Sequence, residues 1–444
     1  MTSATETSTI LPDPVLERAG GLFERAGRDA VAGFIESRGW RVGLVKPVQA
    51  LYRPTQSCLV RYNVRAHDAQ DHLRVVSVCA ETSAEPKSTH AVDDAWDRNY
   101  DFPGPIELRD DLLIWRFPYD PGLRGLQIAA CGKEMRRALA REGHTPLGVS
   151  SQPISYRPRR RALFRYTALY GSRAPVRRAT FYAKVMRTTR ARDVMALADR
   201  LTSRRGLLRR PRPIPSLALP RLSAGRNIVL FDPVGGTALQ DLLLHHRSLP
   251  RPERIVDLMD DISRLTPRDF SVRSHRHRRS VAETSSTAGE LLYRIVPHCS
   301  PQIEFVLNGI ARASQQDSVP RGVVHGDLYA AQVFVEDDFS LSLIDLDDFG
   351  IGDPALDAAN FCAHLLALAL SKPDAKSRLL AYRTLARETF MTRLELSPHD
   401  LDWRESFVML QLATGPFRTL RPDWPRRVAQ FLEVAHRLAT SRAD

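Results

Sequence analysis

The sequence predicts an α+β protein with two lobes, a small β-rich lobe followed by a mostly helical one. Short alternating stretches that follow a proline, such as residues 52–62, are typical of β-hairpins and occur in the first half. After Thr237 apolar residues such as Leu239, Leu242 and Leu243 recur at spacings typical of helices. Helical patterns dominate from residue 355 to the end, and 444 residues are enough for two or three domains.

The first half contains a short internal repeat. The segment that begins with Tyr52 returns at Tyr156, and both copies share Tyr-Arg-Pro, four variable residues, Leu, one variable residue and Arg-Tyr. In each copy the proline starts a turn and the alternating tail is typical of a strand. We expect either a duplicated unit or two hairpins of one design, and the alternative is a coincidence between two arginine-rich hairpins.

The strongest chemical signal lies in two nearby segments of the second half. The first is His325-Gly-Asp327-Leu-Tyr-Ala-Ala-Gln332, and the second begins with Ile344-Asp345 and continues to Asp353-Pro-Ala-Leu-Asp357. Asp327 is suited to orient and deprotonate a hydroxyl group, while the Gln332 amide oxygen and Asp345 are suited to hold Mg²⁺. A single His-Gly-Asp is a common turn, but both segments in this order are hard to obtain by chance.

These segments resemble the catalytic and metal-binding loops of the aminoglycoside phosphotransferase and choline kinase group, which are protein kinase-like small-molecule phosphotransferases. Those loops read roughly His-Gly-Asp-x-x-x-x-Asn and Ile-Asp-x-x-x-x-Gly-x-x-Asp-Pro-x-x-Asp. The resemblance implies that Asp327 is the catalytic base, and that His325 and Asp357 brace its loop. This chain has Gln332 where the family usually has Asn, which places the same carbonyl ligand on a longer stem.

The resemblance also implies a two-lobed protein kinase-like fold and a division of the chain. Residues 1–145 form an N-terminal extension, 146–232 the nucleotide-binding N-lobe, and 233–444 the catalytic and substrate-binding helical C-lobe. The second copy of the repeat takes the place of the nucleotide-covering hairpin. We expect the extension to resemble a degenerate N-lobe, and a true substrate or partner domain is the alternative.

The nucleotide site is expected between the lobes. Lys184 lies on a predicted strand after the second hairpin, where the family keeps the lysine that contacts the phosphates of ATP or GTP. Counting from the first hairpin places Ala80 at the corresponding position, so the first copy lacks this lysine. Leu230, Phe231 and Asp232 are the expected adenine-binding hinge. The helix after Lys184 lacks the glutamate with which the family pairs its lysine.

The second hairpin has no glycine at its turn. Arg159 and Arg160 stand where related loops often contain glycine, and they are candidate ligands of the nucleotide phosphates. A solvated turn is the alternative for each arginine.

The composition narrows the partners. The formal net charge is +13, yet only six of the 64 basic residues are lysines, and no zinc-finger or RNA-binding pattern accompanies them. We therefore expect no specific nucleic acid. No stretch has the roughly 18 to 20 apolar residues that span a bilayer, and no signal peptide is recognisable, so no membrane partner and a cytoplasmic location are expected. The five cysteines show no metal or disulfide spacing.

Together these features predict a kinase that moves the γ-phosphate of ATP or GTP to a hydroxyl of a small molecule with Mg²⁺. A sugar, an aminoglycoside-like or a choline-like alcohol would fit as acceptor. Aminoglycosides are polycations, which so basic a protein would repel unless its pocket is locally acidic. The alternative is a weak or inactive pseudokinase that senses nucleotide or acts as a scaffold, which the missing glutamate and Gln332 favour.

Overall fold

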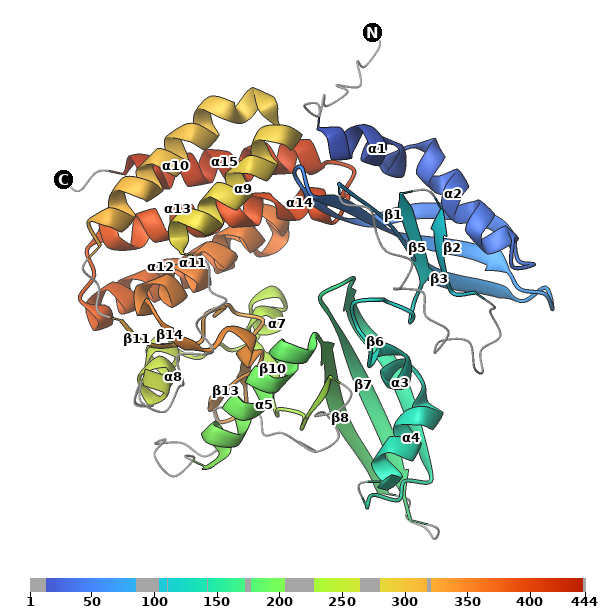
Figure 1. Cartoon of the computed structure of the whole chain (residues 1–444). Helices are drawn as coiled ribbons and strands as arrows, with labels where there is room; N and C mark the ends of the chain where they lie inside the picture. Colours follow the sequence, from blue (N-terminus) through green and yellow to red (C-terminus); the bar gives the residue numbers. More distant parts are fainter. Residues whose placement is uncertain are drawn as a thin grey trace.

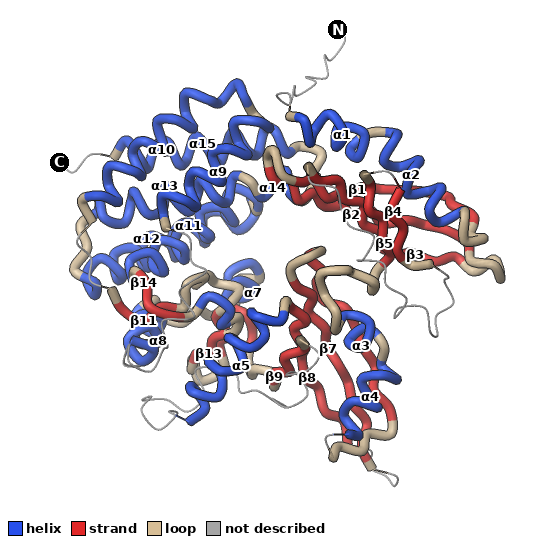
Figure 2. Tube along the Cα trace, viewed as in Figure 1, coloured by secondary structure: helices blue, strands red, loops and turns tan. Residues whose placement is uncertain are grey.

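The computed structural model describes residues 13–84, 104–109, 111–141, 143–171, 177–203, 227–263, 280–317 and 321–441. Two β-rich units lie on one side of the molecule and a large helical lobe on the other (Figures 1 and 2). The prediction of a β-rich part followed by a helical part is confirmed. The predicted fold has one β-rich lobe, whereas the described part of the chain has two β-rich units.

The first unit consists of two helices and a five-stranded antiparallel sheet of order β1-β2-β3-β5-β4. Its elements are α1 (Pro14–Phe23), α2 (Arg25–Glu36), β1 (Arg41–Arg53), β2 (Ser57–His67), β3 (Leu73–Ser83), β4 (Ile106–Arg109) and β5 (Leu112–Arg116). Alternate strand residues such as Val60, Tyr62 and Val78 are fully buried against the two helices. The period of two thus gives this sheet one helix-covered face.

The second unit repeats this arrangement with a four-stranded antiparallel sheet of order β6-β7-β8-β9. Its elements are α3 (Leu126–Ala130), α4 (Gly132–Arg141), β6 (Gly148–Arg157), β7 (Arg161–Tyr170), β8 (Arg177–Met186), α5 (Thr188–Ser203) and β9 (Ile228–Phe231). Helices α3 and α4 pack on this sheet, and the Tyr166 hydroxyl donates to the carbonyl of Ala129 at 2.6 Å. The unit therefore starts earlier than residue 146, where the sequence analysis places its boundary.

Each hairpin turn is anchored in the same way. In the first unit the Tyr52 hydroxyl and the Thr55 backbone N–H, the latter at 2.8 Å, both donate to the buried carboxylate of Asp13. The other oxygen of Asp13 accepts from the N–H of Val15 at 2.9 Å. Thr55 has a φ of 58°, so the carboxylate holds a turn with left-handed backbone.

The second unit uses the equivalent residues. The Tyr156 hydroxyl and the Arg159 N–H donate to the buried carboxylate of Asp120 at 2.9 and 2.7 Å, and the Gly122 N–H donates to its other oxygen at 2.7 Å. Arg159 has a φ of 63°. Because the Asp-Pro start, the two helices, the hairpin and its anchor all recur, the repeat is a duplicated unit rather than a coincidence between two hairpins.

Strand register corrects one expectation. Leu163 of the second hairpin pairs with Lys184, and its counterpart Leu59 pairs with Glu81. Glu81 rather than Ala80 is therefore the counterpart of the lysine. Ala80 lies on the opposite face, buried against the helices of its own unit.

The two units pack through the face of the first sheet that carries Glu81. Arg159 donates to Glu81 from Nη2 and Nε at 2.7 and 3.0 Å, and its guanidinium lies 4.8 Å from the ring centroid of Trp115. The Trp115 indole donates to the Tyr156 hydroxyl at 3.0 Å. In the second unit the corresponding face of the sheet carries Lys184. The equivalent face of the first sheet, which carries Glu81, is thus covered by the second unit.

The helical lobe contains nine helices and five short strands within the described residues. They are β10 (Thr237–Ala238), α7 (Leu239–Leu244), α8 (Glu253–Ser263), α9 (Val281–Ile295), α10 (Ser300–Gln315), β11 (Gly322–Val324), β12 (Val333–Val335), β13 (Leu341–Leu343), β14 (Gly350–Gly352), α11 (Pro354–Ser371), α12 (Lys376–Leu394), α13 (Pro398–Ala413), α14 (Gly415–Arg418) and α15 (Trp424–Thr440). One core joins α9, α10, α13 and α15 to the first unit, and a second surrounds α11 and β11–β13.

Helix α11 is long and apolar enough by composition to cross a membrane, with a mean hydropathy of 1.2. Half of it is buried inside the protein, between α12 and α13. It also carries Asp357 and Asn360, whose side chains hold the loop after β11. These contacts mark it as the core helix of the helical lobe.

Candidate active site

The loop after β11 is held from below by Asp357. Its two carboxylate oxygens accept from the N–H groups of His325 and Gly326 at 2.7 and 2.8 Å. The His325 Nε2 lies 2.9 Å from the carbonyl of Ile344, which ties this loop to the one after β13. His325 and Asp357 thus brace the loop, as the sequence analysis expects.

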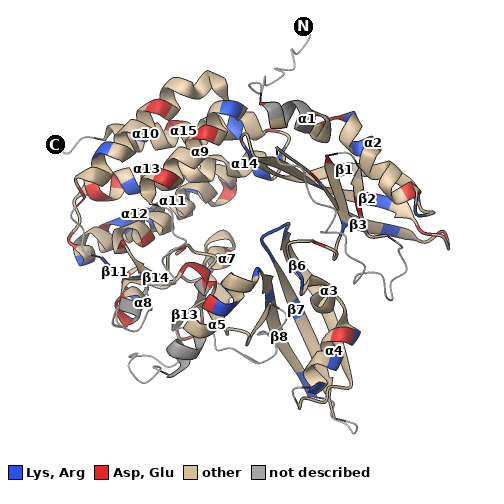
Figure 3. Cartoon of the chain, in the orientation of Figure 1, with Lys and Arg blue, Asp and Glu red and all other residues tan. Residues whose placement is uncertain are grey.

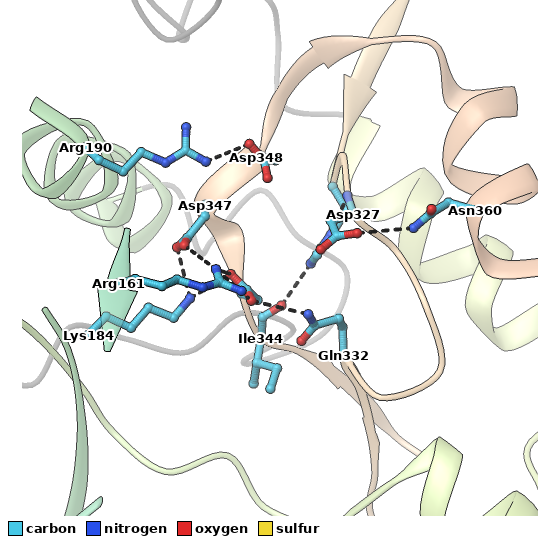
Figure 4. Close-up of polar contacts among 11 residues, drawn as sticks. Arg161, Lys184, Arg190, Asp327, Gln332, Ile344, Asp347, Asp348 and Asn360 are labelled. Atoms are coloured by element: carbon cyan, nitrogen blue, oxygen red, sulfur yellow. Dashed lines mark hydrogen bonds and ion pairs between the residues drawn. The ribbon is translucent and has the colours of Figure 1, made fainter. Parts of the chain in front are cut away.

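Asp327 projects from this braced loop toward Asn360 (Figure 4). The Asn360 amide donates to Asp327 Oδ1 at 3.4 Å and to the carbonyl of Leu328 at 3.0 Å. Burial, followed by the negative charges of Asp345 and Asp348, raises the pKa of Asp327 to about 6. A carboxylate in this state is a stronger base than an exposed aspartate and remains ionised at neutral pH.

Gln332 and Asp345 lie at the two ends of the β12–β13 hairpin. The Gln332 side chain is buried, and its Nε2 lies 3.3 Å from Asp345 Oδ2 (Figure 4). The Ile344 N–H donates to the Gln332 carbonyl at 3.1 Å, so the backbone also joins the two residues. Asp345 has a φ of 65°, a left-handed conformation that costs about 1 kcal/mol or more and that is common where a side chain is aimed at a ligand.

Two cations from the second sheet reach two carboxylates of this loop. Lys184 Nζ lies 2.7 Å from Asp345 and 2.9 Å from Asp347, and Arg161 Nη1 lies 2.8 Å from Asp347 and 3.4 Å from Asp345 (Figure 4). Burial raises the pKa of Asp345, but Lys184 and Arg161 lower it by more, so its pKa lies below the usual range. The carboxylate is therefore ionised.

Arg161 and Asp347 are site residues that the sequence analysis missed. Arg161 is one of three consecutive arginines, and Asp347 is one of two adjacent acids that no pattern in the sequence distinguishes. A third ion pair, Arg190 with Asp348 at 2.6 Å, joins α5 to the same loop. Helix α5 lacks the glutamate that the sequence analysis expects as the partner of Lys184. In this chain the carboxylate partners of Lys184 are Asp345 and Asp347 of the loop.

The expected hinge lies beside Lys184 on the neighbouring strand β9. The Lys184 ammonium lies 5.6 Å from the ring centroid of Phe231. Leu230 is fully buried in the core of the second unit, and Asp232 is exposed beyond the strand. These positions fit an adenine-binding edge next to a phosphate-binding lysine.

The two turn arginines have different surroundings. The Arg159 guanidinium is directed to Glu81 of the first unit, so contact with a nucleotide would require it to leave that ion pair. Arg160 lines two cavities that meet at Asp327. The three arginines of the turn therefore point to three places, Arg159 to the first unit, Arg160 to the cavities and Arg161 to the aspartate loop.

The residues present fit Mg²⁺ in the way that nucleotide-dependent enzymes usually bind it. Within the described residues no group of three or more His, Cys, Asp or Glu side chains forms a complete metal cage. Mg²⁺ is commonly held by one or two carboxylates together with substrate phosphates and water. Asp345 and Gln332, with Asp347 nearby, supply that partial set.

Two cavities of about 930 and 1390 Å³ share Asp327 as a lining residue, and the larger one also reaches Arg161 and Asp347. Both have walls from each β-unit and from the helical lobe, so the first unit helps to enclose them. Asn360 also lines both, and the stacked pair Tyr329 and His364, with ring centroids 4.4 Å apart, lines the smaller one. A small molecule in this space would have Asp327 within reach.

A family model described as "Phosphotransferase enzyme family" matches residues 173–390, from the start of the second unit's third strand to α12. The match contains Lys184, Asp327, Gln332 and Asp345, but not the first unit or the second hairpin. A comparison with curated proteins found no match.

Several solved structures are distantly similar. The GDP complex of aminoglycoside 2'-phosphotransferase-IIIa has 14% identity and a TM-score of 0.44, and covers 69% of this chain and 97% of its own. A choline/ethanolamine kinase family protein from Mesorhizobium loti has 12% identity and a TM-score of 0.47, with 70% and 95% covered. The apo form of a thermostable mutant of aminoglycoside phosphotransferase APH(4)-Ia has 14% identity and a TM-score of 0.46, with 69% and 100% covered.

The family match falls on the segments that carry both motifs, and the structure brings the side chains of those motifs together. Residues 173–390 of the chain therefore match the phosphotransferase enzyme family.

Proposed function

We propose that this phosphotransferase moves the γ-phosphoryl group of ATP or GTP to a hydroxyl of a small molecule, with Mg²⁺. The observation that supports this most directly is the position of Asp327 between two sites. Lys184, Gln332 and Asp345 suit a metal-bound nucleotide, and the smaller cavity, which Asp327 lines and these three residues do not, suits an acceptor.

In the reaction the acceptor hydroxyl would donate a hydrogen bond to Asp327. Its oxygen forms a bond to the γ-phosphorus while the bond from that phosphorus to the β,γ-bridging oxygen breaks, and the nucleoside diphosphate leaves. The hydroxyl proton passes to Asp327 and then to solvent. Mg²⁺ held by Gln332 and Asp345 would neutralise charge on the phosphates. Positioning and electrostatics thus supply most of the catalysis.

Lys184 is placed to join the nucleotide to the loop. Its ammonium group has three N–H donors, of which Asp345 and Asp347 accept two. The third is left for a phosphate oxygen. This arrangement lets one lysine contact the nucleotide and also orient the metal-binding carboxylate.

The Asp327→Asn variant tests the role of the base. We expect turnover to fall by about 10²- to 10⁴-fold, because Asn cannot accept the proton, while nucleotide affinity changes little. Steady-state release of nucleoside diphosphate and calorimetric nucleotide binding measure the two quantities. Asp29→Asn, whose side chain is two-thirds exposed on α2, is the matched control. Wild-type turnover in Asp327→Asn would remove Asp327 from the mechanism.

A nucleotide-sensing pseudokinase is the second candidate, and the closed ion-pair network favours it. Lys184 and Arg161 pair with Asp345 and Asp347 across the lobes, so the charges of the site are balanced by its own side chains. Tight nucleotide binding without phosphoryl transfer to any alcohol would select this function.

A further inference from the structure

The arginine of the Tyr-Arg-Pro repeat has no role in the proposed phosphoryl transfer, yet both copies of it line the cavities at Asp327. In both copies the tyrosine is anchored to a buried aspartate and the proline is buried, which fixes the turn. The arginine between them, Arg53 in the first unit and Arg157 in the second, is exposed and lines both cavities at Asp327. The duplicated turns therefore place two equivalent guanidinium groups at one space.

Arg160 and Arg418 line the same two cavities. Burial, and then Arg157, Arg161 and Arg53, lower the pKa of Arg160; burial, and then Arg157 and Arg160, lower the pKa of Arg418. These groups therefore lie close enough to repel one another. Figure 3 shows basic residues at the tip of the β6–β7 hairpin, from which Arg157 and Arg160 come.

Five of the carboxylates around the cavities are paired with other cations, and Glu283 in the larger cavity accepts from the Ser280 N–H. Glu81 pairs with Arg159, Asp347 with Lys184, Asp348 with Arg190, and Asp317 and Asp353 with Arg404, at 2.5 to 2.9 Å. Within the part of the chain that the structure describes, the side chains of Arg53, Arg157, Arg160 and Arg418 have no ion pair. Four guanidinium groups thus line one space without a directly ion-paired carboxylate; Asp348 acts on Arg160 only from a distance.

All four arginines line the smaller cavity together with Asp327, and the ion-paired residues Lys184, Asp345 and Asp347 do not line that cavity. Lys184, Phe231, Gln332 and Asp345 line neither cavity. Arg53 comes from the first unit and Arg418 from α14, neither of which carries an expected nucleotide ligand. An occupant of the cavities could thus contact these arginines and Asp327 together.

We propose that the phosphate acceptor is a hydroxylated small anion, whose phosphate or carboxylate group is bound by Arg53, Arg157, Arg160 and Arg418 while its hydroxyl faces Asp327. This rests on the proposed phosphotransfer. Guanidinium groups bind phosphate and carboxylate through paired N–H donors, and partial enclosure strengthens such bonds. The same four charges disfavour polycationic and quaternary-ammonium alcohols.

Anion binding tests the proposal without a known acceptor. The full chain is first saturated with a non-hydrolysable Mg²⁺–ATP analogue, so that the nucleotide site is filled. Inorganic phosphate and citrate are then titrated separately by calorimetry, and the stronger binder identifies the anionic group. We expect at least one to bind in the millimolar range or tighter, and Arg53→Gln or Arg418→Gln to weaken it about 10-fold or more.

Arg25→Gln removes the same charge from an almost fully exposed site on α2 and should leave anion binding unchanged. Thermal unfolding of each variant establishes that it is folded, and Arg53, being exposed, serves if Arg418→Gln is unstable. Absence of anion binding to the nucleotide-saturated wild type overturns the proposal. Equal weakening by Arg25→Gln also overturns it, because the effect would then reflect net charge alone.

Turnover separates this proposal from the proposed function. Glucose 6-phosphate, glucuronate, glucose, glucosamine and choline are compared as acceptors with Mg²⁺–ATP. An anionic member should be preferred, with its KM raised about 10-fold by Arg53→Gln and the KM for ATP almost unchanged. Preference for glucosamine or choline overturns the anionic acceptor but leaves phosphotransfer intact, whereas absence of nucleotide binding and transfer defeats the proposed function itself.

Discussion

Asp327 owes its basicity to its surroundings. It is largely enclosed, and Asp345 and Asp348 lie near enough to raise its pKa. Asn360 supplies one weak hydrogen bond, which orients the carboxylate without neutralising it. A carboxylate with a pKa near neutrality is a better proton acceptor at working pH than one with an ordinary value.

This pKa predicts the pH dependence of the reaction. The group works as a base only when ionised, so kcat/KM for the nucleotide should fall as the pH drops through about 6. The Asp348→Asn variant removes a negative neighbour, which lowers the pKa and should move the acid limb to lower pH. Ionisation of ATP itself would not move with this variant. A pH–rate profile that is flat through pH 6 in the wild type, or unshifted in the variant, would contradict the assignment.

The residues that sequence could and could not predict differ in the range of their contacts. Asp327, Gln332, Asp345 and Lys184 stand in patterns that indicate chemistry locally, and the structure gathers them. Arg161 acts through partners almost 190 positions later in the chain, at 2.8 Å from Asp347. No local pattern distinguishes it from Arg160, so only the folded chain shows which arginine reaches the loop.

At the scale of elements, the duplicated hairpin forms the turn of both β-rich units and provides the contact between them. The sequence predicted the two matching turns but placed Ala80 at the position of the first copy that corresponds to Lys184. The paired register places Glu81 there, because the two copies differ by one residue between the turn and the third strand. A shift of one residue moves a strand side chain to the other face of its sheet. Because of this one-residue difference, the position that corresponds to Lys184 is occupied by Glu81, which binds Arg159 of the second unit, and not by the buried Ala80.

The contact between Glu81 and Arg159 should couple the two units measurably. Because the pair is partly buried and doubly hydrogen-bonded, a double-mutant cycle of Glu81→Gln and Arg159→Gln should give a coupling energy of about 1 to 2 kcal/mol in the free energy of unfolding. The exposed pair Arg41 and Asp71, at 2.6 Å, is the comparison and should couple by less than about 0.5 kcal/mol. Equal coupling in the two cycles would contradict a structural role for the inter-unit pair.

At the scale of the molecule, the first unit joins the two parts of the phosphotransferase. It shares one core with the C-terminal helices and another with the second unit. The cavities at Asp327 consequently have walls from all three parts. The family match covers neither the first unit nor α14, and these are the parts that supply Arg53 and Arg418. The catalytic groups and the groups that would choose the acceptor thus have separate origins in the chain.

The proposed mechanism requires a metal-bound nucleotide to bind beside the ion-paired side chains of Lys184 and Asp345. Calorimetric titration of the full chain with a non-hydrolysable ATP analogue, with and without Mg²⁺, tests it most directly. We expect binding that Mg²⁺ strengthens, that Asp345→Ala makes insensitive to Mg²⁺, and that the exposed control Asp29→Asn leaves unchanged. No binding at millimolar analogue, or binding whose response to Mg²⁺ survives in Asp345→Ala, would contradict the site.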